Sequence, residues 1–431
     1  MAPVEAPTAP RLPSRLYRWV VLVFVSLAMF GNYYFYDALS PLADVLQKQL
    51  HFSDQNIGLL NSFYSIAPIA TVLLGGFIID RIGTRKATLL FGVICLIGAI
   101  VTAATPKFLV MATGRLIFGM GAESLIVSVT TALAKWFRGK ELSFAFGVNL
   151  MIARAGTWLA QNSPSWAPSA YNSWQTPWWI GVGFVTFCVT GPLLYWWLEV
   201  RAEREYSLGK AGEADKVVFS DLYRFGRSYW YVVALCVLFY SAIFPFETFA
   251  VKFFIDAHGT SRQLGGFLIS VLTACTIFGT PAFGLFADKV GRRATLMVLG
   301  SVLLIPVFFL MGYTRITLYL PMGMMGVAFA LIPAVMWPSV AYLVPQEKLG
   351  TAYGLMTMVQ NIGLASVNEL LGLANDHAQA SAANPAGYHP MLQILTGLGV
   401  AGFVFALLLR AREVGPQAHG LETITTASRT A

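Results

Sequence analysis

The sequence predicts an all-α membrane protein in which twelve transmembrane helices form two pseudo-symmetric six-helix bundles. Of its 431 residues, 56% are hydrophobic and 12% are charged, and the mean hydropathy of +0.64 excludes an ordinary soluble domain. A helix needs about 20 apolar residues to cross the hydrocarbon core. Segments of that kind fall at residues 17–39, 57–80, 86–105, 107–136, 141–163, 177–198, 229–255, 263–287, 294–313, 315–344, 348–374 and 388–410.

A repeated turn relates the two bundles. The segment GFIIDRIGTR at residues 76–85 recurs 208 residues later as GLFADKVGRR at residues 284–293, each time after a long apolar run. We expect its glycines to let backbones cross closely and its carboxylate to hold the N-terminus of a neighbouring helix, with the basic residues in the headgroup region. Such a duplication indicates a transporter built from two parallel repeats. The motif residues are Gly76, Asp80, Arg81, Gly83, Arg85, Gly284, Asp288, Lys289, Gly291 and Arg293.

The basic residues predict the orientation in the membrane. With the N-terminus inside, 22 of the 29 Lys and Arg residues lie on the cytoplasmic side, five lie outside and two fall within spans. This asymmetry predicts that both termini are cytoplasmic, and the net charge of +8 then reflects topology rather than a nucleic-acid partner. The predicted organisation is a cytoplasmic tail (1–16), an N-terminal bundle (17–198), a charged cytoplasmic linker (199–228), a C-terminal bundle (229–411) and a polar, disordered cytoplasmic tail (412–431).

The chain carries no sequence signature of a metal site, a cofactor or an enzyme. All four cysteines fall inside predicted spans, which argues against a disulfide framework or a metal cluster. No histidine lies in mid-membrane, and the H-E-x-x-H and G-x-S-x-G motifs are absent. We therefore expect no cofactor, no metal and no enzymatic activity. The cysteines are Cys95, Cys188, Cys236 and Cys275.

Two charged residues are predicted near the middle of the membrane. Glu123 lies 14 residues before the end of the fourth span near Phe137, and Arg154 lies 13 residues after the start of the fifth near Glu141. At 1.5 Å per residue, both sit about 20 Å from the cytoplasmic end. Charges at that depth are costly and need a cavity or a partner. A carboxylate and a guanidinium at one level can bind the two ends of a zwitterion.

The alternative is that Glu123 and Arg154 form a packing salt bridge. The repeat does not duplicate them, because at an offset of 207 residues Glu123 matches Ala330 and Arg154 matches Asn361. Because the two charges occur in just one of the two halves, we expect them to have a functional role rather than a scaffold role. Arg115, in the same span as Glu123, is expected nearer the outer surface, where it either couples helices or contacts substrate. The expected neighbours of the charged pair are Asn149, Asn361, Gln360, Tyr33 and Trp158.

A second charged group is predicted toward the outer ends of the spans. In the functional interpretation, Lys252 closes an outer gate by pairing with a carboxylate when the outer side is shut. In the alternative interpretation these are ordinary charges at the membrane surface. The candidate gate residues are Asp37, Glu247, Lys252 and Glu369.

The repeated turn resembles the major facilitator superfamily, and this resemblance covers the whole chain. It implies that superfamily's fold of two six-helix bundles. A narrower similarity, to the lysosomal dipeptide uniporters of the superfamily, rests on residues 114–125, 135–142, 153–154, 337–345, 349–354 and 360–365. It implies that Glu123 binds a peptide N-terminus and Arg154 its C-terminal carboxylate. The chain lacks a glycosylation sequon and a clear dileucine sorting signal, so we expect a bacterial member in the inner cell membrane.

Two transport functions fit these features. The first is alternating-access transport of small zwitterions, most of all dipeptides, by uniport or linked to protons. The alternative is a proton-coupled symporter of small organic anions, in which Arg154 binds the anion and Glu123 carries the proton. A sensor that does not transport also fits the sequence. The expected partners are the small-molecule substrate, the lipid bilayer and protons, and we expect a monomer.

Overall fold

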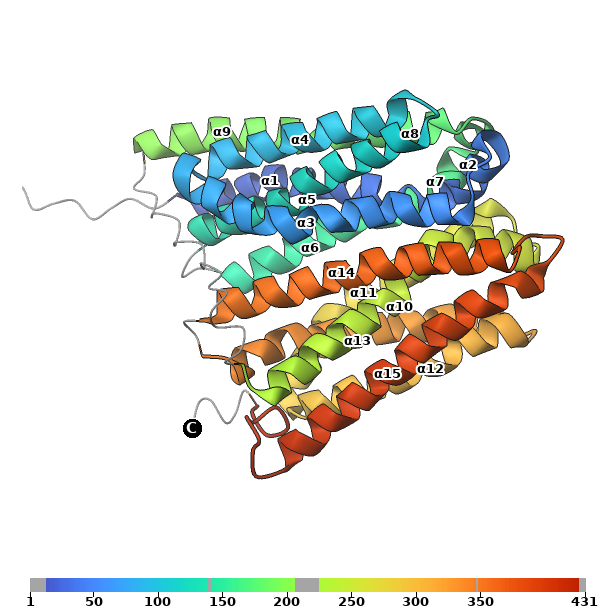
Figure 1. Ribbon diagram of the computed structural model, residues 1–431. Coiled ribbons are helices and arrows are strands. Elements are labelled where there is room, and N and C mark those ends of the chain that lie inside the picture. Colours follow the sequence, from blue (N-terminus) through green and yellow to red (C-terminus); the bar gives the residue numbers. More distant parts are fainter. Residues whose placement is uncertain (1–12, 138–140, 206–224, 346–347, 426–431) are drawn as a thin grey trace, which may run out of the picture.

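Long helices make up most of the structure, a computed structural model that describes residues 13–137, 141–205, 225–345 and 348–425, apart from the side chains of residues 70, 72–74, 76, 80, 143 and 205 (Figure 1). The first half contains α1 (Arg15–Asp37), η1 (Ser40–Leu42), α2 (Ala43–Leu50), α3 (Asp54–Ile82), α4 (Thr84–Ala104), α5 (Phe108–Phe137), α6 (Leu142–Gln161), α7 (Ser163–Trp166), η2 (Pro168–Asn172), α8 (Gln175–Val185) and α9 (Phe187–Glu205). The second half contains α10 (Arg227–His258), α11 (Arg262–Val290), α12 (Arg293–Tyr313), α13 (Tyr319–Leu343), α14 (Leu349–His377), η5 (Pro385–Tyr388) and α15 (His389–Val414).

The helices confirm the predicted architecture of twelve spans. Within the described residues, nine helical segments are long and apolar enough to cross a membrane by length and composition. The remaining spans are α3, α6 and α14, which carry polar residues such as Asn61, Arg154 and Asn368. Most of the predicted linker, residues 206–224, lies outside the described part of the chain.

The sixth span is two helices rather than one. The hydroxyl of Thr186 donates to the carbonyl oxygen of Gly183 at 2.6 Å, and the amide of Val189 bonds to the carbonyl of Thr186 at 3.0 Å. Such local bonds compete with the regular helical pattern. Pro192 also lacks the amide that would bond to the carbonyl of residue 188. Hydropathy does not register this break, because both pieces are apolar.

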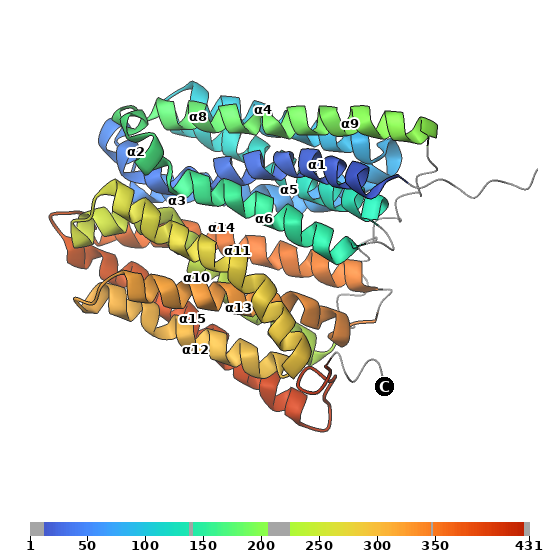
Figure 2. The same cartoon turned by 180° about the vertical axis from the view of Figure 1, so that it is seen from behind.

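The two halves meet at one end of the molecule. We call the end formed by α2, α7, η2 and η5 the far end, and the end where α1 begins and α9 and α15 finish the terminal end. Figure 1 shows the first half above the second, with α3 beside α14. In Figure 2, α6 and α11 lie close together at the far end and diverge toward the terminal end. The hydrogen bonds and ion pairs between the halves cluster at the far end.

The two copies of the repeated turn share a glycine with positive φ but differ in ψ, which is 159° at Gly83 and −129° at Gly291. Gly83 and Gly291 end α3 and α11 with φ angles of 82° and 70°, a region that glycine enters without steric cost. An added Cβ at Gly83 or Gly284 would meet nothing within 4 Å, so close crossing of backbones does not explain these two glycines, contrary to expectation. Positive φ explains Gly83 and Gly291 instead. The side chain of Asp80 and the atoms around Gly76 lie outside the described set.

The basic residues of the two turns have different partners. Arg85 bonds to the carboxylate of Glu203 on α9 at 2.6 Å, whereas its counterpart Arg293 bonds to Asp288 at 2.7 Å. Arg293 also donates to the carbonyl oxygen of Ile424 at 2.7 Å. Arg81 and Lys289 are exposed. The second turn is therefore held by the C-terminal segment, and among the described residues no such segment contacts the first turn.

That segment corrects the prediction of a disordered tail from residue 412, because α15 continues to Val414 and residues 415–425 fold back onto the second half. The buried carboxylate of Glu413 accepts bonds from the hydroxyl of Ser228 at 3.0 Å and the amide of His419 at 2.8 Å. The carboxylate of Glu422 accepts from the amide and hydroxyl of Thr295, at 2.7 and 2.8 Å, in the first turn of α12. Leu421 is fully buried. The composition of the tail suggested disorder because Leu421 is the one fully buried apolar residue that anchors residues 415–425.

Ending the chain after Val414 is expected to lower the free energy of unfolding by about 2–4 kcal/mol, since the burial of one leucine and several bonds to carboxylates are lost. Thermal unfolding of purified protein in detergent measures the effect. A chain ended after Thr425 keeps every contact described above and serves as the matched control. Equal melting temperatures for the two truncated chains would show that the docked tail does not stabilise the fold.

Candidate functional site

Glu123 and Arg154 lie on neighbouring helices and do not neutralise each other. Glu123, on α5, accepts a hydrogen bond from the hydroxyl of Tyr64 at 3.0 Å. Arg154, on α6, places its guanidinium carbon 5.6 Å from the ring centre of Tyr33 and 5.4 Å from that of Phe329. Both charged residues are half-buried, and no ion pair joins them, although both belong to the described residues. In this conformation the pair is not a packing salt bridge.

Arg154 is bound by aromatic rings from both halves. Tyr33 comes from α1, and Phe329 comes from α13 in the second half. A guanidinium over an aromatic face is attracted by the ring quadrupole yet keeps its donors free for a carboxylate. The guanidinium is also close enough to Asp37 and Glu247 to interact with them electrostatically.

Phe329 belongs to an aromatic group whose position beside Arg154 the sequence did not indicate. Its ring lies edge-on to Phe244 at 5.5 Å, and Phe244 stacks on Tyr240 at 5.5 Å. The indole nitrogen of Trp337 donates to the hydroxyl of Tyr240 at 3.0 Å. Aromatic residues are common in apolar spans, so no local signal distinguishes these rings from ordinary core residues.

The predicted polar neighbours are bound locally. Asn149 is buried and accepts a bond from the hydroxyl of Ser26 at 2.9 Å. Asn361 donates to the carbonyl of Thr357 on its own helix at 3.0 Å. Gln360 accepts a weak bond from the thiol of Cys236 at 3.5 Å. These contacts orient the amides, and no described contact joins them to Glu123 or Arg154.

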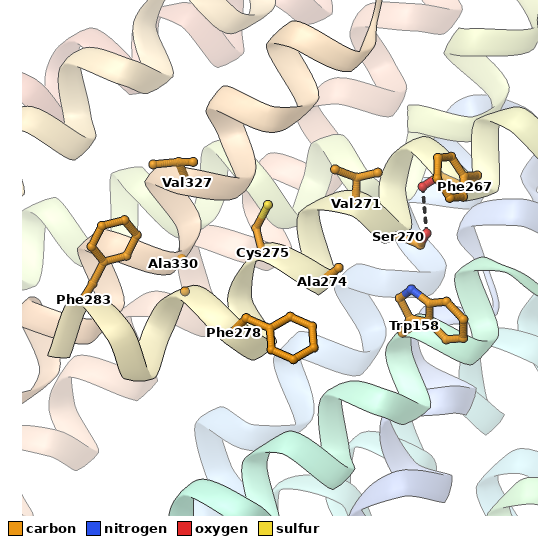
Figure 3. Close-up of a pocket in the computed structure, with 11 residues that line it drawn as sticks. Trp158, Phe267, Ser270, Val271, Ala274, Cys275, Phe278, Phe283, Val327 and Ala330 are labelled. Carbon is orange, nitrogen blue, oxygen red and sulfur yellow. Dashed lines mark hydrogen bonds between the residues drawn. The ribbon is translucent and has the colours of Figure 1, made fainter. Parts of the chain in front are cut away.

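Trp158 lies in a separate apolar pocket. The pocket has a volume of about 530 Å³. Figure 3 shows Trp158 below a row of α11 side chains that includes Phe267 and Cys275. Ala330 and Val327 of α13 line the same pocket. The structure thus brings Tyr33, but not Trp158, to the ring contact around Arg154.

Arg115 is completely buried between helices. Its guanidinium donates to the carbonyl oxygens of Phe35 and Tyr36 at 3.3 and 3.5 Å, and its Nε donates to that of Leu60 at 3.4 Å. The first two belong to the last turn of α1, where carbonyls lack partners within the helix. The arginine thereby ties α5 to α1 and α3.

The predicted partners of Lys252 were wrong. Its ammonium bonds to the carboxylate of Asp54 at 3.0 Å and to the hydroxyl of Tyr388 at 2.8 Å, with Asp256 at 3.5 Å. Lys252 and Asp54 are each 1% exposed. Because Asp54 begins α3 and Lys252 lies on α10, this buried ion pair joins the two halves at the far end.

The three carboxylates expected to pair with Lys252 lie elsewhere. Asp37 accepts a bond from the hydroxyl of Thr157 at 2.6 Å. Glu247 is buried, and its backbone carbonyl accepts a bond from the hydroxyl of Ser40. Glu369 is half-buried on α14.

Further polar contacts close the far end. Arg262 on α11 pairs with Asp44 on α2 at 2.6 Å. The carboxylate of Asp376 accepts the amides of Asp54 and Gln55, both at 2.8 Å, and so caps the N-terminus of α3 from the other half. Negative charge at a helix N-terminus is favourable. Among the described residues, no group of three or more His, Cys, Asp or Glu side chains suits a metal ion.

Comparison with known proteins identifies the family. Residues 25–367 match the sequence profile of the Major Facilitator Superfamily, and the chain belongs to this family. It is 32% identical over 394 residues to the lysosomal dipeptide transporter MFSD1 of Homo sapiens, covering 87% of this chain and 84% of that protein. The corresponding protein of Danio rerio is 32% identical over 375 residues, with 83% and 80% covered. These relatives are transporters rather than enzymes.

More distant relatives agree on the fold. A galacturonate transporter of Dickeya chrysanthemi is 26% identical over 263 residues, 56% of this chain and 73% of that protein. A bacterial homologue of the human lysosomal transporter Spinster, solved in an inward-facing and unoccupied conformation, superposes with a TM-score of 0.70 at 17% identity, covering 93% and 96%. The nucleoside transporter NupG gives 0.70 at 16% identity, covering 91% and 98%. The chain is a multi-pass membrane transporter.

Proposed function

We propose that this transporter carries dipeptides, with Glu123 as the ligand of the peptide ammonium group and Arg154 as the ligand of its carboxylate. The observation that carries the proposal is the separation of the two charges, since Glu123 is held by a hydroxyl and Arg154 by aromatic rings. Within the described residues neither Glu123 nor Arg154 forms an ion pair, so each can take the opposite terminus of a zwitterion. The dipeptide transporters at 32% identity support this substrate class.

The proposal extends to the orientation and the transport cycle. The terminal end faces the cytoplasm and the protein acts as a monomer in the inner cell membrane, an orientation supported by the excess of basic residues near that end. The conformation described above then corresponds to a closed outer side, as in the inward-facing Spinster homologue. Asp37 and Glu247, two buried carboxylates near Arg154, are the proposed sites of any coupled proton.

Transport of small organic anions is the second candidate. The galacturonate transporter among the relatives favours it, and Arg154 is a suitable carboxylate ligand. The two candidates differ in the charge that they require of Glu123. A zwitterion needs Glu123 ionised, whereas an anion is bound best when Glu123 is protonated.

A ligand panel tests the proposal. Purified protein is screened by thermal shift against dipeptides, amino acids, hexuronates and other organic acids, and ligands that bind are then tested for uptake into liposomes. A ligand at 100 times its dissociation constant should add about 2.7 kcal/mol of stability. We expect dipeptides to stabilise the protein and to be taken up. Stabilisation by organic acids alone would favour the anion symporter, and binding without uptake would favour a sensor.

A further inference from the structure

Glu123 is held by a buried tyrosine that has a charged neighbour of its own. Tyr64, on α3, is 7% exposed and donates its hydroxyl to Glu123 at 3.0 Å. Its ring lies 4.6 Å from that of Tyr36 and 5.8 Å from that of Phe118. These contacts leave the ring little freedom. The direction of the Glu123 carboxylate is therefore set by a side chain that a ligand in the site would not need to touch.

The guanidinium of Arg115 packs over the ring of this tyrosine. Its guanidinium carbon lies 5.4 Å from the ring centre of Tyr64 and 5.6 Å from that of Tyr36. Within the part of the chain that the structure describes, no carboxylate forms an ion pair with Arg115. Asp37 is close enough to interact with Arg115 electrostatically, but the direct contacts of this buried cation are dipoles and ring faces, so its position is sensitive to each of them.

The hydrogen bonds of Arg115 are linked to the second half of the protein through Asn61. Arg115 donates to the amide oxygen of Asn61, and the amide nitrogen of Asn61 donates to the hydroxyl of Thr248 on α10 at 2.8 Å. Thr248 in turn donates to the amide oxygen of Asn368 on α14 at 2.9 Å. Asn61, Thr248 and Asn368 are 5%, 3% and 1% exposed. The chain of contacts is intact only while the two halves are together at the far end.

We propose that Tyr64 is a positioning residue that directs the Glu123 carboxylate toward the ligand's ammonium group, and that Arg115, Asn61 and Thr248 connect this direction to closure of the far end. The inference rests on the proposed role of Glu123 as ammonium ligand. Because the same contacts support the carboxylate and the closed interface, ligand binding favours closure, and closure favours binding by the same factor.

Tyr64→Phe tests the positioning role, because it keeps the ring over Arg115 and removes only the hydroxyl. Binding of a free dipeptide should weaken roughly tenfold, as expected for a hydrogen bond to a charged group. An N-acetylated dipeptide, which has no ammonium group, should be affected less than twofold. In a Glu123→Gln background, Tyr64→Phe should cause less than a twofold further loss.

Two results would overturn the positioning role. One is an equal loss for the free and acetylated peptides, and the other is a full additional loss in the Glu123→Gln background. Glu123→Gln by itself separates the two proposals. If that variant binds free dipeptide normally, the proposed function fails, and if it binds weakly while Tyr64→Phe binds normally, only the positioning role fails.

Thr248→Val tests the connection, and Thr248→Ser is its matched control because serine keeps the hydroxyl. The reporter is Ser62→Cys, at a position that is 2% exposed and bonds to the carbonyl of Ala365 in the other half. We expect Thr248→Val to increase labelling of this cysteine and to weaken dipeptide binding severalfold. Thr248→Ser should leave the labelling and the dipeptide affinity as they are in the protein with Thr248. Increased labelling with unchanged affinity, or no change in labelling, would refute the connection.

Discussion

Replacing Glu123 with Gln is expected to weaken the binding of a free dipeptide by roughly ten- to a hundredfold. The substitution keeps the shape of the side chain and an oxygen that can accept from Tyr64. It removes the negative charge that would meet the peptide ammonium group, and charge-assisted contacts are worth about 1.5–3 kcal/mol. Arg154→Ala should cause a loss of similar size, because the carboxylate of the ligand would then lack its cation.

Peptides blocked at one end make this prediction specific. An N-acetylated dipeptide should bind the unmodified protein poorly and lose little more in Glu123→Gln, and a C-amidated dipeptide should behave in the same way with Arg154→Ala. Isothermal titration of the four combinations measures the pattern. A damaged site would weaken all peptides alike. Equal binding of blocked and free peptides would contradict the clamp and favour the organic-anion alternative.

The sequence predicts the fold well because membrane insertion depends on properties that are local. Apolar length alone locates nine helical segments among the described residues, and the repeated turn predicts two equivalent bundles. The structure adds that Gly83 and Gly291 share a positive φ, which is the conformational reason for the repeated glycine. Breaks inside an apolar run, such as the one at Thr186, have no hydropathy signal and could not be predicted.

The candidate site was predictable only in part. Axial spacing along two helices was sufficient to single out Glu123 and Arg154, since the rise per residue is fixed. Their neighbours depend on how helices rotate and on which helices of the other half approach. The contacts of Tyr64 with Glu123 and of Phe329 with Arg154 follow from that packing. No spacing within one span contains this information.

The partner of Lys252 illustrates the same limit. Asp54 follows Ser53, whose hydroxyl caps α3, so the sequence around it reads as an ordinary helix start. Its second role appears only when α10 of the other half packs against that start and brings Lys252 to 3.0 Å. Candidate partners were sought among charges inside the spans, whereas the actual partner lies at a helix end.

Lys252→Met is expected to open the far end, because it leaves the buried carboxylate of Asp54 without its cation. Removing one member of a buried ion pair costs about 3–5 kcal/mol. That cost falls only on the closed state, so the ratio of closed to open molecules should fall by roughly a hundredfold or more. Labelling of Ser62→Cys from the far-end side measures the shift.

Three comparison variants show whether the buried pair is responsible. Lys48→Met removes a lysine whose side chain is 65% exposed and pairs with Asp44, so it should leave labelling unchanged. Gly58→Val should open the far end without any change of charge, since an added Cβ would lie 2.2 Å from the carbonyl oxygen of Asn368. The double variant Lys252→Met with Asp54→Asn removes both charges, and it should label less than Lys252→Met alone because no unpaired carboxylate remains. If Lys252→Met labels no more than the unmodified protein, the far end is not held by this ion pair, and the capping of α3 by Asp376 becomes the stronger candidate for the closing contact.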